Sequence, residues 1–269
     1  MILCKENYHS LEANRVYMSN SLFKSFLPQY NGCEARAMAI LAGDWQDQVD
    51  SKALLVGQYV HAWNEGALQE FIARHSAEIL KRDGSPRAEF VQADQMIETL
   101  RNDPQITRAR EGEKEVIFVG ELFGMPWKIM IDVYNLELGV ITDLKTCREI
   151  HRTEYNPVTR RRENMIQLYG YDWQMASYAE IVRLGTGGGK GWFAPHIIAV
   201  SKESPPDKEL INFGTEFIKP TLDEMSLFAP GVRAVWTGEV EPTRCGKCDY
   251  CRATKVLTKA VHYTEIGEV

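Results

Sequence analysis

The sequence predicts an α/β fold in which a mixed β-sheet is flanked by helices. Three observations lead to this prediction. The first part of the chain is largely helical in pattern, residues 113–145 alternate between apolar and polar positions, and a helical stretch at 165–183 precedes one more strand-like segment. Helices, then a strand meander, then a helix and a strand are the order expected for a sheet whose faces are covered by helices.

The helical part begins with residues that are typical of a helix start. Ser19 and Ser21 precede an apolar-periodic run, and Cys33 stands just before a second helical stretch. The longest helical pattern covers residues 53–80, and another covers residues 88–101. These patterns predict a helical part that precedes any strand.

The middle of the chain has the pattern of three antiparallel strands. Residues 113–145 are rich in Val, Ile, Phe and Trp, and glycines stand near the expected turns. The segment WFAPHIIAVSKE predicts one more strand, and residues 207–235 predict a closing helical segment.

The composition is that of an ordinary globular chain. Of 269 residues, 44% are hydrophobic and 25% are charged. We expect a single domain with a helical part at 1–110, an α/β core at 111–205 and a helical C-terminal part at 206–269. No stretch reaches the roughly 18 apolar residues of a membrane span, and the N-terminus lacks a secretion signal, so we expect a cytoplasmic protein without membrane contact.

Charge and cysteine content narrow the possible partners. The formal net charge is −6, so contact with nucleic acid has to come from a local basic patch. Six cysteines without a secretion signal argue against a disulfide framework and favour metal binding or buried thiols.

The strand-like stretch VITDLKTC carries an acid and a base on one face. Asp143 and Lys145 are two residues apart and project together, and a hairpin through NLELG brings Asp132 of the preceding strand opposite them. Two neighbouring carboxylates disfavour each other's ionisation unless a cation lies between them. The pattern predicts a Mg²⁺ or Mn²⁺ site in which Lys145 orients the attacking water or helps to deprotonate it.

Each of these residues also has a simpler interpretation. An isolated Asp-x-Lys pair is usually an ion pair on a surface hairpin. His61 could be a hydrogen-bonded core histidine, and Gln174 with Tyr178 could form the edge of an amphipathic helix. Their occurrence together, in this order, favours a functional site.

The order G-x-x-x-H-x-x-x-E, a strand-terminal Asp, D-x-K and Q-x-x-x-Y resembles the PD-(D/E)-x-K nuclease superfamily, in its RecB-like exonuclease branch. The stretches GCEARAMA, ALLVGQYVHA, GELFGMPWKIMID, DLKT, GYDWQMASY and RCGKCDYCRATK are similar to phage-type exonuclease VIII (RecE-like) domains. The resemblance covers most of the chain and implies a restriction-endonuclease-like core.

The resemblance also implies roles for single residues. Asp132 and Asp143 would be metal ligands together with the backbone carbonyl of Leu144, and Lys145 would be the catalytic lysine. His61 would be a further ligand or would organise the site, and Gln174 and Tyr178 would support the lysine and contact DNA. An upstream glutamate ligand is also implied, for which we favour Glu113 over Glu115.

The implied activity is that of a metal-dependent exonuclease acting on double-stranded DNA ends. It would work with a single-strand annealing protein in phage-type homologous recombination, and relatives of this kind suggest a homo-oligomer. Two alternatives stay open: a nuclease of CRISPR adaptation or of restriction type, and a DNA-binding module of the same fold without cleavage activity.

A basic segment lies between the Asp-x-Lys strand and the Gln174 helix. Affinity for DNA depends mainly on phosphate contacts, and this segment is the best candidate for them, although interspersed glutamates also fit a solvated turn. The candidate DNA-binding residues are Arg148, Arg152, Arg160, Arg161 and Arg162.

Four cysteines form a candidate second metal site. Cys245, Cys248 and Cys251 follow a C-x-x-C-x-x-C pattern, and Cys33 offers a distant fourth thiolate. A triplet plus one remote cysteine favours a [4Fe–4S] cluster, with Zn²⁺ as the alternative. Related RecB-like nucleases join their two termini in this way, which implies a structural role.

Overall fold

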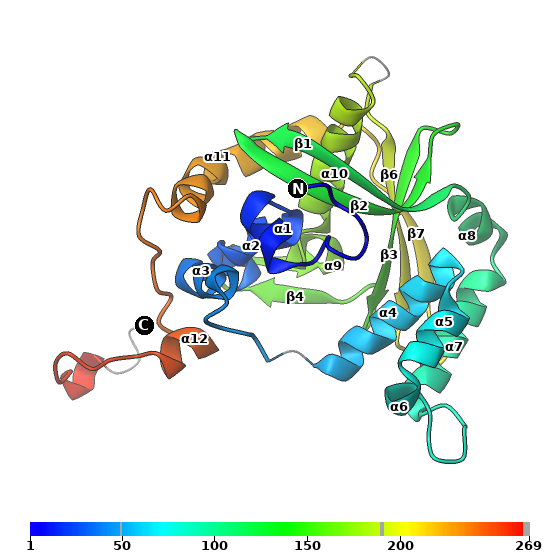
Figure 1. Ribbon diagram of the computed structural model, residues 1–269, viewed down its shortest axis with the longest axis horizontal. Helices are drawn as coiled ribbons and strands as arrows, with labels where there is room; N and C mark the ends of the chain where they lie inside the picture. The colour runs from blue at the N-terminus through cyan, green and yellow to red at the C-terminus, as the bar shows by residue number, and fades with distance from the viewer. Residues whose placement is uncertain (49, 189–190, 266–269) are drawn as a thin grey trace.

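A computed structural model describes residues 1–48, 50–188 and 191–265 and shows a five-stranded mixed sheet flanked by helices (Figure 1). The strand order is β1-β2-β3-β6-β7, and only the β3–β6 pair is parallel. The sheet strands are β1 (Glu113–Leu122), β2 (Met125–Asn135), β3 (Val140–Cys147), β6 (Ala194–Ser201) and β7 (Lys208–Asn212). The predicted fold class is therefore confirmed.

The first three strands form the predicted meander. Phe123 and Gly124 both have positive φ in the tight turn between β1 and β2, and Gly139 has a φ of 64° just before β3. These left-handed positions allow the two reversals, and glycine adopts them with little cost. The alternating apolar residues of β2 and β3 thereby enter the core.

The remaining elements are short or helical. A separate two-stranded hairpin consists of β4 (Thr153–Asn156) and β5 (Arg161–Asn164). The helices before the sheet are α1 (Leu11–Val16), α2 (Asn20–Ser25), η1 (Pro28–Tyr30), α3 (Glu34–Ala42), α4 (Ser51–Glu65), α5 (Leu68–Arg74), α6 (Ser76–Ile79), α7 (Ala88–Arg101) and α8 (Pro104–Ala109). Those after β3 are α9 (Met165–Leu168), α10 (Tyr171–Gly185), α11 (Ile218–Trp236), α12 (Asp249–Ala253) and η2 (Tyr263–Glu265).

Two predicted elements differ from the observed ones. The expected helix at 53–80 is divided into α4, α5 and α6, because Gly66 adopts a left-handed conformation and ends α4. The segment 207–235, expected to be helical, begins with strand β7 and becomes helical only at Ile218. Strand β7 pairs with β6 and forms the edge of the sheet, and local periodicity does not reveal this pairing between strands.

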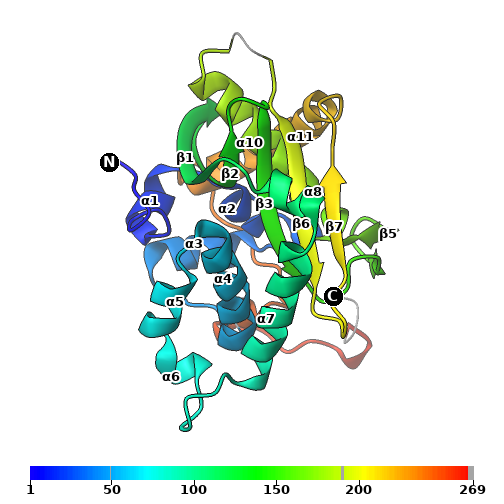
Figure 2. The ribbon, with the colours of Figure 1, turned by 90° about the vertical axis from the view of Figure 1, so that its right-hand side faces the viewer.

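Helices cover both faces of the sheet and divide the core. One large cluster joins α10, α11 and α2 to β2 around Trp127 and Trp173. A second cluster joins α4 and α7 to Leu144 of β3 and to Ile198 and Val200 of β6. Figures 1 and 2 show α4 to α7 grouped on one side of the sheet, away from α11. The acidic residues of β2 and β3 lie between these two cores.

A segment of the C-terminal part of the chain packs against α3 of the N-terminal part. The backbone N–H of Ala35 donates to the carbonyl of Thr243 over 3.0 Å, and α12 lies next to α3 (Figure 1). The predicted C-terminal part therefore includes α11 and α12, while residues 266–269 lie outside the described residues.

Among the described residues, no helix is both long enough and apolar enough to cross a membrane.

Candidate active site

Three acidic residues occupy neighbouring cross-strand positions where the sheet ladder is interrupted. Lys114 pairs with Val133 and Val116 with Ile131, so Glu115 stands opposite Asp132, yet these two residues form no ladder pair. The pairing of β2 with β3 ends at Val133 and Thr142, so Asp132 and Asp143 lie one position beyond it. The strands separate at the carboxylates, which leaves their side chains room to face a common centre.

The backbone of Glu115 is itself unusual. Its φ is 55°, a left-handed conformation that is uncommon for a residue with a side chain. Such backbone strain is found at functional sites, where the surrounding structure holds the residue in place. Here it turns Glu115 out of the regular β1 ladder.

Helix α4 brings His61 to this group of acids. Its Nδ1 lies 3.4 Å from Oδ2 of Asp132, and the same oxygen accepts the N–H of Leu144 over 2.6 Å. The ligand atoms of His61, Glu115 and Asp132 all lie within 4.8 Å of one another. The Asp132 carboxylate thereby links α4, β2 and β3.

Helix α10 contacts the carboxylate of Asp143. Gln174 donates from Nε2 to Oδ1 of Asp143 over 2.7 Å, and Nζ of Lys145 lies 2.7 Å from Oδ2. The ammonium group of Lys145 also stands 4.7 Å from the centre of the Tyr171 ring. Asp143 and Lys145 thus project together, as the strand alternation predicts.

Burial and neighbouring charges shift the pKa values of these groups. Burial and the nearby Asp132 raise the pKa of Glu115 to about 7. Burial lowers the pKa of His61, but the attraction of Asp132 outweighs it and raises the pKa to about 9. Burial, opposed by Lys145, raises the pKa of Asp143. Without a bound cation, the proton on His61 compensates part of the negative charge of the neighbouring carboxylates.

The donor set fits a divalent cation. His61, Glu115 and Asp132 offer one nitrogen and carboxylate oxygens at mutual distances that one ion can bridge, and Asp143 lies beside them. Carboxylates that raise each other's pKa are stabilised as anions when a cation binds between them. Oxygen-rich sites of this kind suit Mg²⁺ or Mn²⁺.

Two details of the predicted ligand set change. Glu113 is exposed and pairs with Tyr134 in the regular ladder, whereas Glu115 lies beside His61 and Asp132, so the preference for Glu113 is wrong. The two glutamates have the same strand parity, and the register of β1 against β2 separates them, because it places Glu115 and not Glu113 opposite Asp132. For Leu144 the structure records its N–H as a donor to Asp132, while its carbonyl remains a proposed ligand.

Tyr178 lies one helical turn after Gln174 on α10. Burial, with the nearby Tyr8, Asp143 and Asp132, raises its pKa well above the ordinary value, so its hydroxyl stays protonated. The Q-x-x-x-Y pattern therefore places both polar side chains toward the acidic residues.

The sequence interpretation missed Lys24, which approaches the site from α2. Its ammonium group donates to the carbonyl of Tyr169 and stands 5.8 Å from the centre of the Tyr171 ring. Burial and the neighbouring Lys145 lower its pKa to about 8. At Gly170, a Cβ would lie only 2.8 Å from Lys24 Cδ and from a Tyr30 ring atom, so glycine permits this close packing. No short motif links Lys24 to the site, because the contact depends on folding across the chain.

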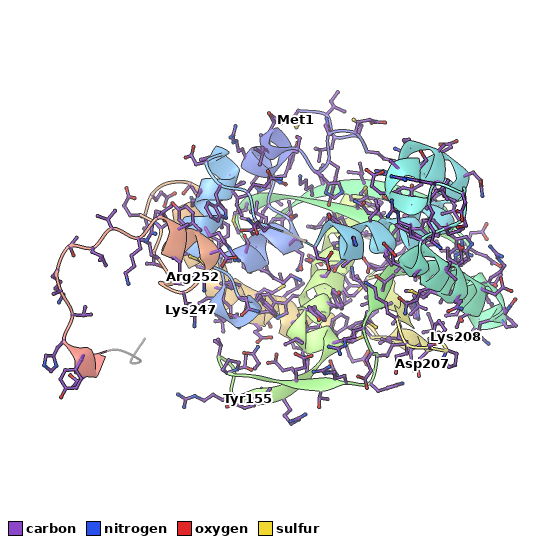
Figure 3. All side chains as sticks on the ribbon, turned by 90° about the horizontal axis from the view of Figure 1, so that it is seen from below. Met1, Tyr155, Asp207, Lys208, Lys247 and Arg252 are labelled. Atoms are coloured by element: carbon purple, nitrogen blue, oxygen red, sulfur yellow. The ribbon has the colours of Figure 1, made fainter. Side chains whose placement is uncertain are left out.

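The basic segment after β3 is mostly the β4–β5 hairpin, where a loop or turn was expected. Arg162 donates from Nη2 to the carbonyl of Thr153 over 3.1 Å, and Arg152 lies 3.2 Å from Glu154. Arg148 and Arg160 are exposed as well. Figure 3 shows the neighbouring Tyr155 at the outer edge of the molecule. Arg161 and Arg162 also line a cavity of about 450 Å³ between the hairpin, α10 and α11.

The four cysteines form the second group. Cys33, Cys245, Cys248 and Cys251 have their sulfur atoms within 4.8 Å of one another, and all four are free thiols. The predicted association of one N-terminal and three C-terminal cysteines is therefore present, and it can hold a metal.

The mixed sheet and the acidic residues at its opened strands define a protein with the PD-(D/E)XK nuclease fold. A family model described as a PDDEXK-like domain of unknown function (DUF3799) matches residues 19–254. The chain belongs to this family.

One solved structure agrees with this assignment. A protein from Eubacterium rectale whose crystal structure is described as that of a "Putative exonuclease" is 37% identical, with a TM-score of 0.89, over 99% of this chain and 98% of that one. The crystal structure of SSO0001 matches at 13% identity and a TM-score of 0.30, over 80% of this chain and 89% of that one, and supports no conclusion. Among curated proteins, none matches this chain.

Proposed function

We propose that this protein is a divalent-metal-dependent exonuclease that hydrolyses phosphodiester bonds of linear double-stranded DNA from an end. The observation that supports this most directly is the group formed by buried Asp132 and Asp143 with half-buried Glu115, with His61 and Lys145 beside it. The relative from Eubacterium rectale, described as a "Putative exonuclease", supports the choice of activity.

The side chains have distinct roles in this proposal. His61, Glu115, Asp132 and Asp143 would hold Mg²⁺ or Mn²⁺, which supplies Lewis-acid assistance to the phosphodiester and activates water. Lys145, whose ammonium Nζ lies 2.7 Å from Asp143, is placed to orient the attacking water and to stabilise the negative charge that develops on the phosphodiester. Gln174 is a positioning residue, because its amide fixes one oxygen of Asp143.

Contact with DNA needs positive charge, which the acidic chain as a whole does not provide. The exposed arginines of the β4–β5 hairpin and of the segment before it are proposed to bind backbone phosphates. The wider context that we propose is phage-type homologous recombination in the cytoplasm, with a single-strand annealing protein as partner and with self-association of the nuclease.

The test compares linear and closed circular duplexes, labelled at the 5′ or 3′ ends where ends exist, with and without Mg²⁺. We expect progressive degradation of the linear DNA only, and a loss of roughly 100-fold or more in Asp132→Asn, because the substitution removes a ligand charge. The asparagine side chain of this variant retains a carbonyl oxygen for the Leu144 N–H, so the protein should stay folded and lose only the stability that the Asp132–His61 ion pair contributes.

Asp223→Asn is the matched control, since Asp223 is exposed on α11 and pairs with Lys219. The control should retain full activity. Cleavage of circular DNA at the same rate would indicate an endonuclease of restriction type, and DNA binding without cleavage would indicate a non-catalytic module. Either result overturns the proposal.

A further inference from the structure

The separations within the cysteine group distinguish between the two metals that its sequence pattern allows. The sulfur atoms of Cys33 and Cys251 are 3.6 Å apart, those of Cys245 and Cys251 are 3.9 Å apart, and all four lie within 4.8 Å. With Zn–S bonds of about 2.3 Å, sulfur atoms at the corners of a tetrahedron are about 3.8 Å apart. The observed separations therefore agree with four thiolates around one ion.

A [4Fe–4S] cluster does not fit this arrangement. In such a cluster each thiolate binds a different iron atom, so the four cysteine sulfurs surround the whole iron–sulfide core. Cys33 and Cys251 already have their sulfurs in van der Waals contact at 3.6 Å, which leaves no space for that core between them. The cluster that related nucleases suggest is thus disfavoured by the geometry of this chain.

Backbone groups around the sulfurs are arranged as they are for bound thiolates. The N–H of Cys248 points to the sulfur of Cys245 at 3.3 Å, and the N–H of Cys251 points to the sulfur of Cys248 at 3.4 Å. Such outer hydrogen bonds orient metal ligands and stabilise their charge. The second and third cysteines of the motif are thereby fixed by the first turn of α12.

We propose that Cys33, Cys245, Cys248 and Cys251 bind one Zn²⁺ ion in a closed tetrathiolate site that joins α12 to α3. All four positions are protein ligands, as in structural zinc sites, so no open position remains for substrate. The site links residues 218 positions apart in the sequence. It is a structural centre, separate from the acidic residues that we propose for hydrolysis.

The surroundings show why a metal is needed here. The apolar cluster at this place consists of the four cysteines with Ala35 and Tyr250. Further support comes from Glu34, whose carboxylate accepts the N–H of Thr243 over 2.8 Å. So small a cluster contributes little apolar burial, and metal binding in such a site supplies much of the local folding energy.

The experiment measures metal content and absorption of the full chain, purified without oxygen from cells supplied with both iron and zinc. We expect about one zinc per chain, no brown colour, and, after exchange with Co²⁺, the visible bands of a tetrahedral thiolate complex. Cys251→Ser should lose most of the zinc, whereas Cys4→Ser, which changes an exposed cysteine outside the group, should retain it.

A second measurement does not depend on the variants' folding. A zinc-selective chelator, with Mg²⁺ kept in excess, should lower the melting temperature of the unmodified protein and raise amide exchange at residues 243–254 more than in β3. Iron and sulfide at cluster stoichiometry, or protein without metal whose α12 stays protected from exchange, would overturn the proposal. Neither measurement uses nuclease activity, so the result is independent of the proposed reaction.

Discussion

The acidic centre and the cysteine centre hold their ligands by different means. Asp132 and Asp143 lie between two extensive hydrophobic clusters, with α4 and α10 supplying His61 and Gln174. The cysteines belong to a small cluster near the chain ends, and two of the four are only half-buried. The comparison indicates that two large cores position the acidic centre, whereas the zinc ion that we propose would stabilise the cysteine centre.

The difference follows from the cost of each ligand type. Buried carboxylates repel one another and lose hydration, so they persist only where a rigid scaffold and compensating cations hold them. Thiols are neutral when protonated and pack as small apolar groups without a metal. A centre of carboxylates therefore needs a large core around it, whereas four thiols can gather in a small cluster, where their thiolates can then bind an ion.

Replacement of Lys145 by methionine should give the largest effect. Lys145→Met removes the cation beside buried Asp143, and activity should fall on the order of 10³-fold, within the range that general acid–base groups contribute. The protein should also lose stability, because breaking a buried ion pair costs about 3–5 kcal/mol. Single-turnover cleavage and chemical denaturation measure the two effects.

The double variant Asp143→Asn with Lys145→Met separates charge from packing. The double variant should regain much of the stability that the single Lys145→Met variant loses, since neither partner of the ion pair is left charged and unpaired. It should remain inactive. A single Lys145→Met variant with unchanged stability would show that the acidic centre does not depend on its internal charge balance, contrary to the comparison above.

The two glutamates of β1 give a matched pair with the next largest effect. Glu115→Gln should lower cleavage by about 100-fold, since even outer-shell partners of metal ligands contribute 10–100-fold. Glu113→Gln, at an exposed position two residues away, should change cleavage little. Equal losses in both variants, measured at saturating Mg²⁺, would contradict the assignment of Glu115.

The pH dependence of metal binding gives a smaller effect. Because the pKa of His61 is raised in the fold, its protonated form stabilises the metal-free protein. This contribution is fully present at pH values below 6.5, the ordinary pKa of histidine, and is lost as the pH rises through about 9. A cation must displace that proton, so Mg²⁺ affinity should rise close to tenfold from pH 7 to pH 8. Calorimetry at both pH values measures this.

His61→Gln is the control for this measurement. The variant has no titrating ring, so most of the slope between pH 7 and pH 8 should disappear. A slope that stays the same in His61→Gln would assign the released proton to another group. Zinc at the cysteine centre should be retained over the same range, which would distinguish the two centres further.

Much of the acidic site could be predicted because its pieces are local patterns. Strand alternation puts Asp143 and Lys145 together, and helical spacing puts Gln174 and Tyr178 together. Which glutamate reaches the centre could not be predicted, since Glu113 and Glu115 have the same parity, and strand alternation does not give the register that places Glu115 opposite Asp132. Lys24 was missed for a related reason, because its contact joins α2 to the turn between α9 and α10.

The fold class, the Asp-x-Lys strand and the cysteine spacing follow from the order of residues alone, because they depend on short periodicities and on residue chemistry. The folded chain was needed to show where β2 and β3 separate, that Glu115 faces His61, and how closely four sulfurs approach. Those features arise from packing between segments far apart in the chain, and side-chain positions near a metal depend on such packing to within an ångström or less.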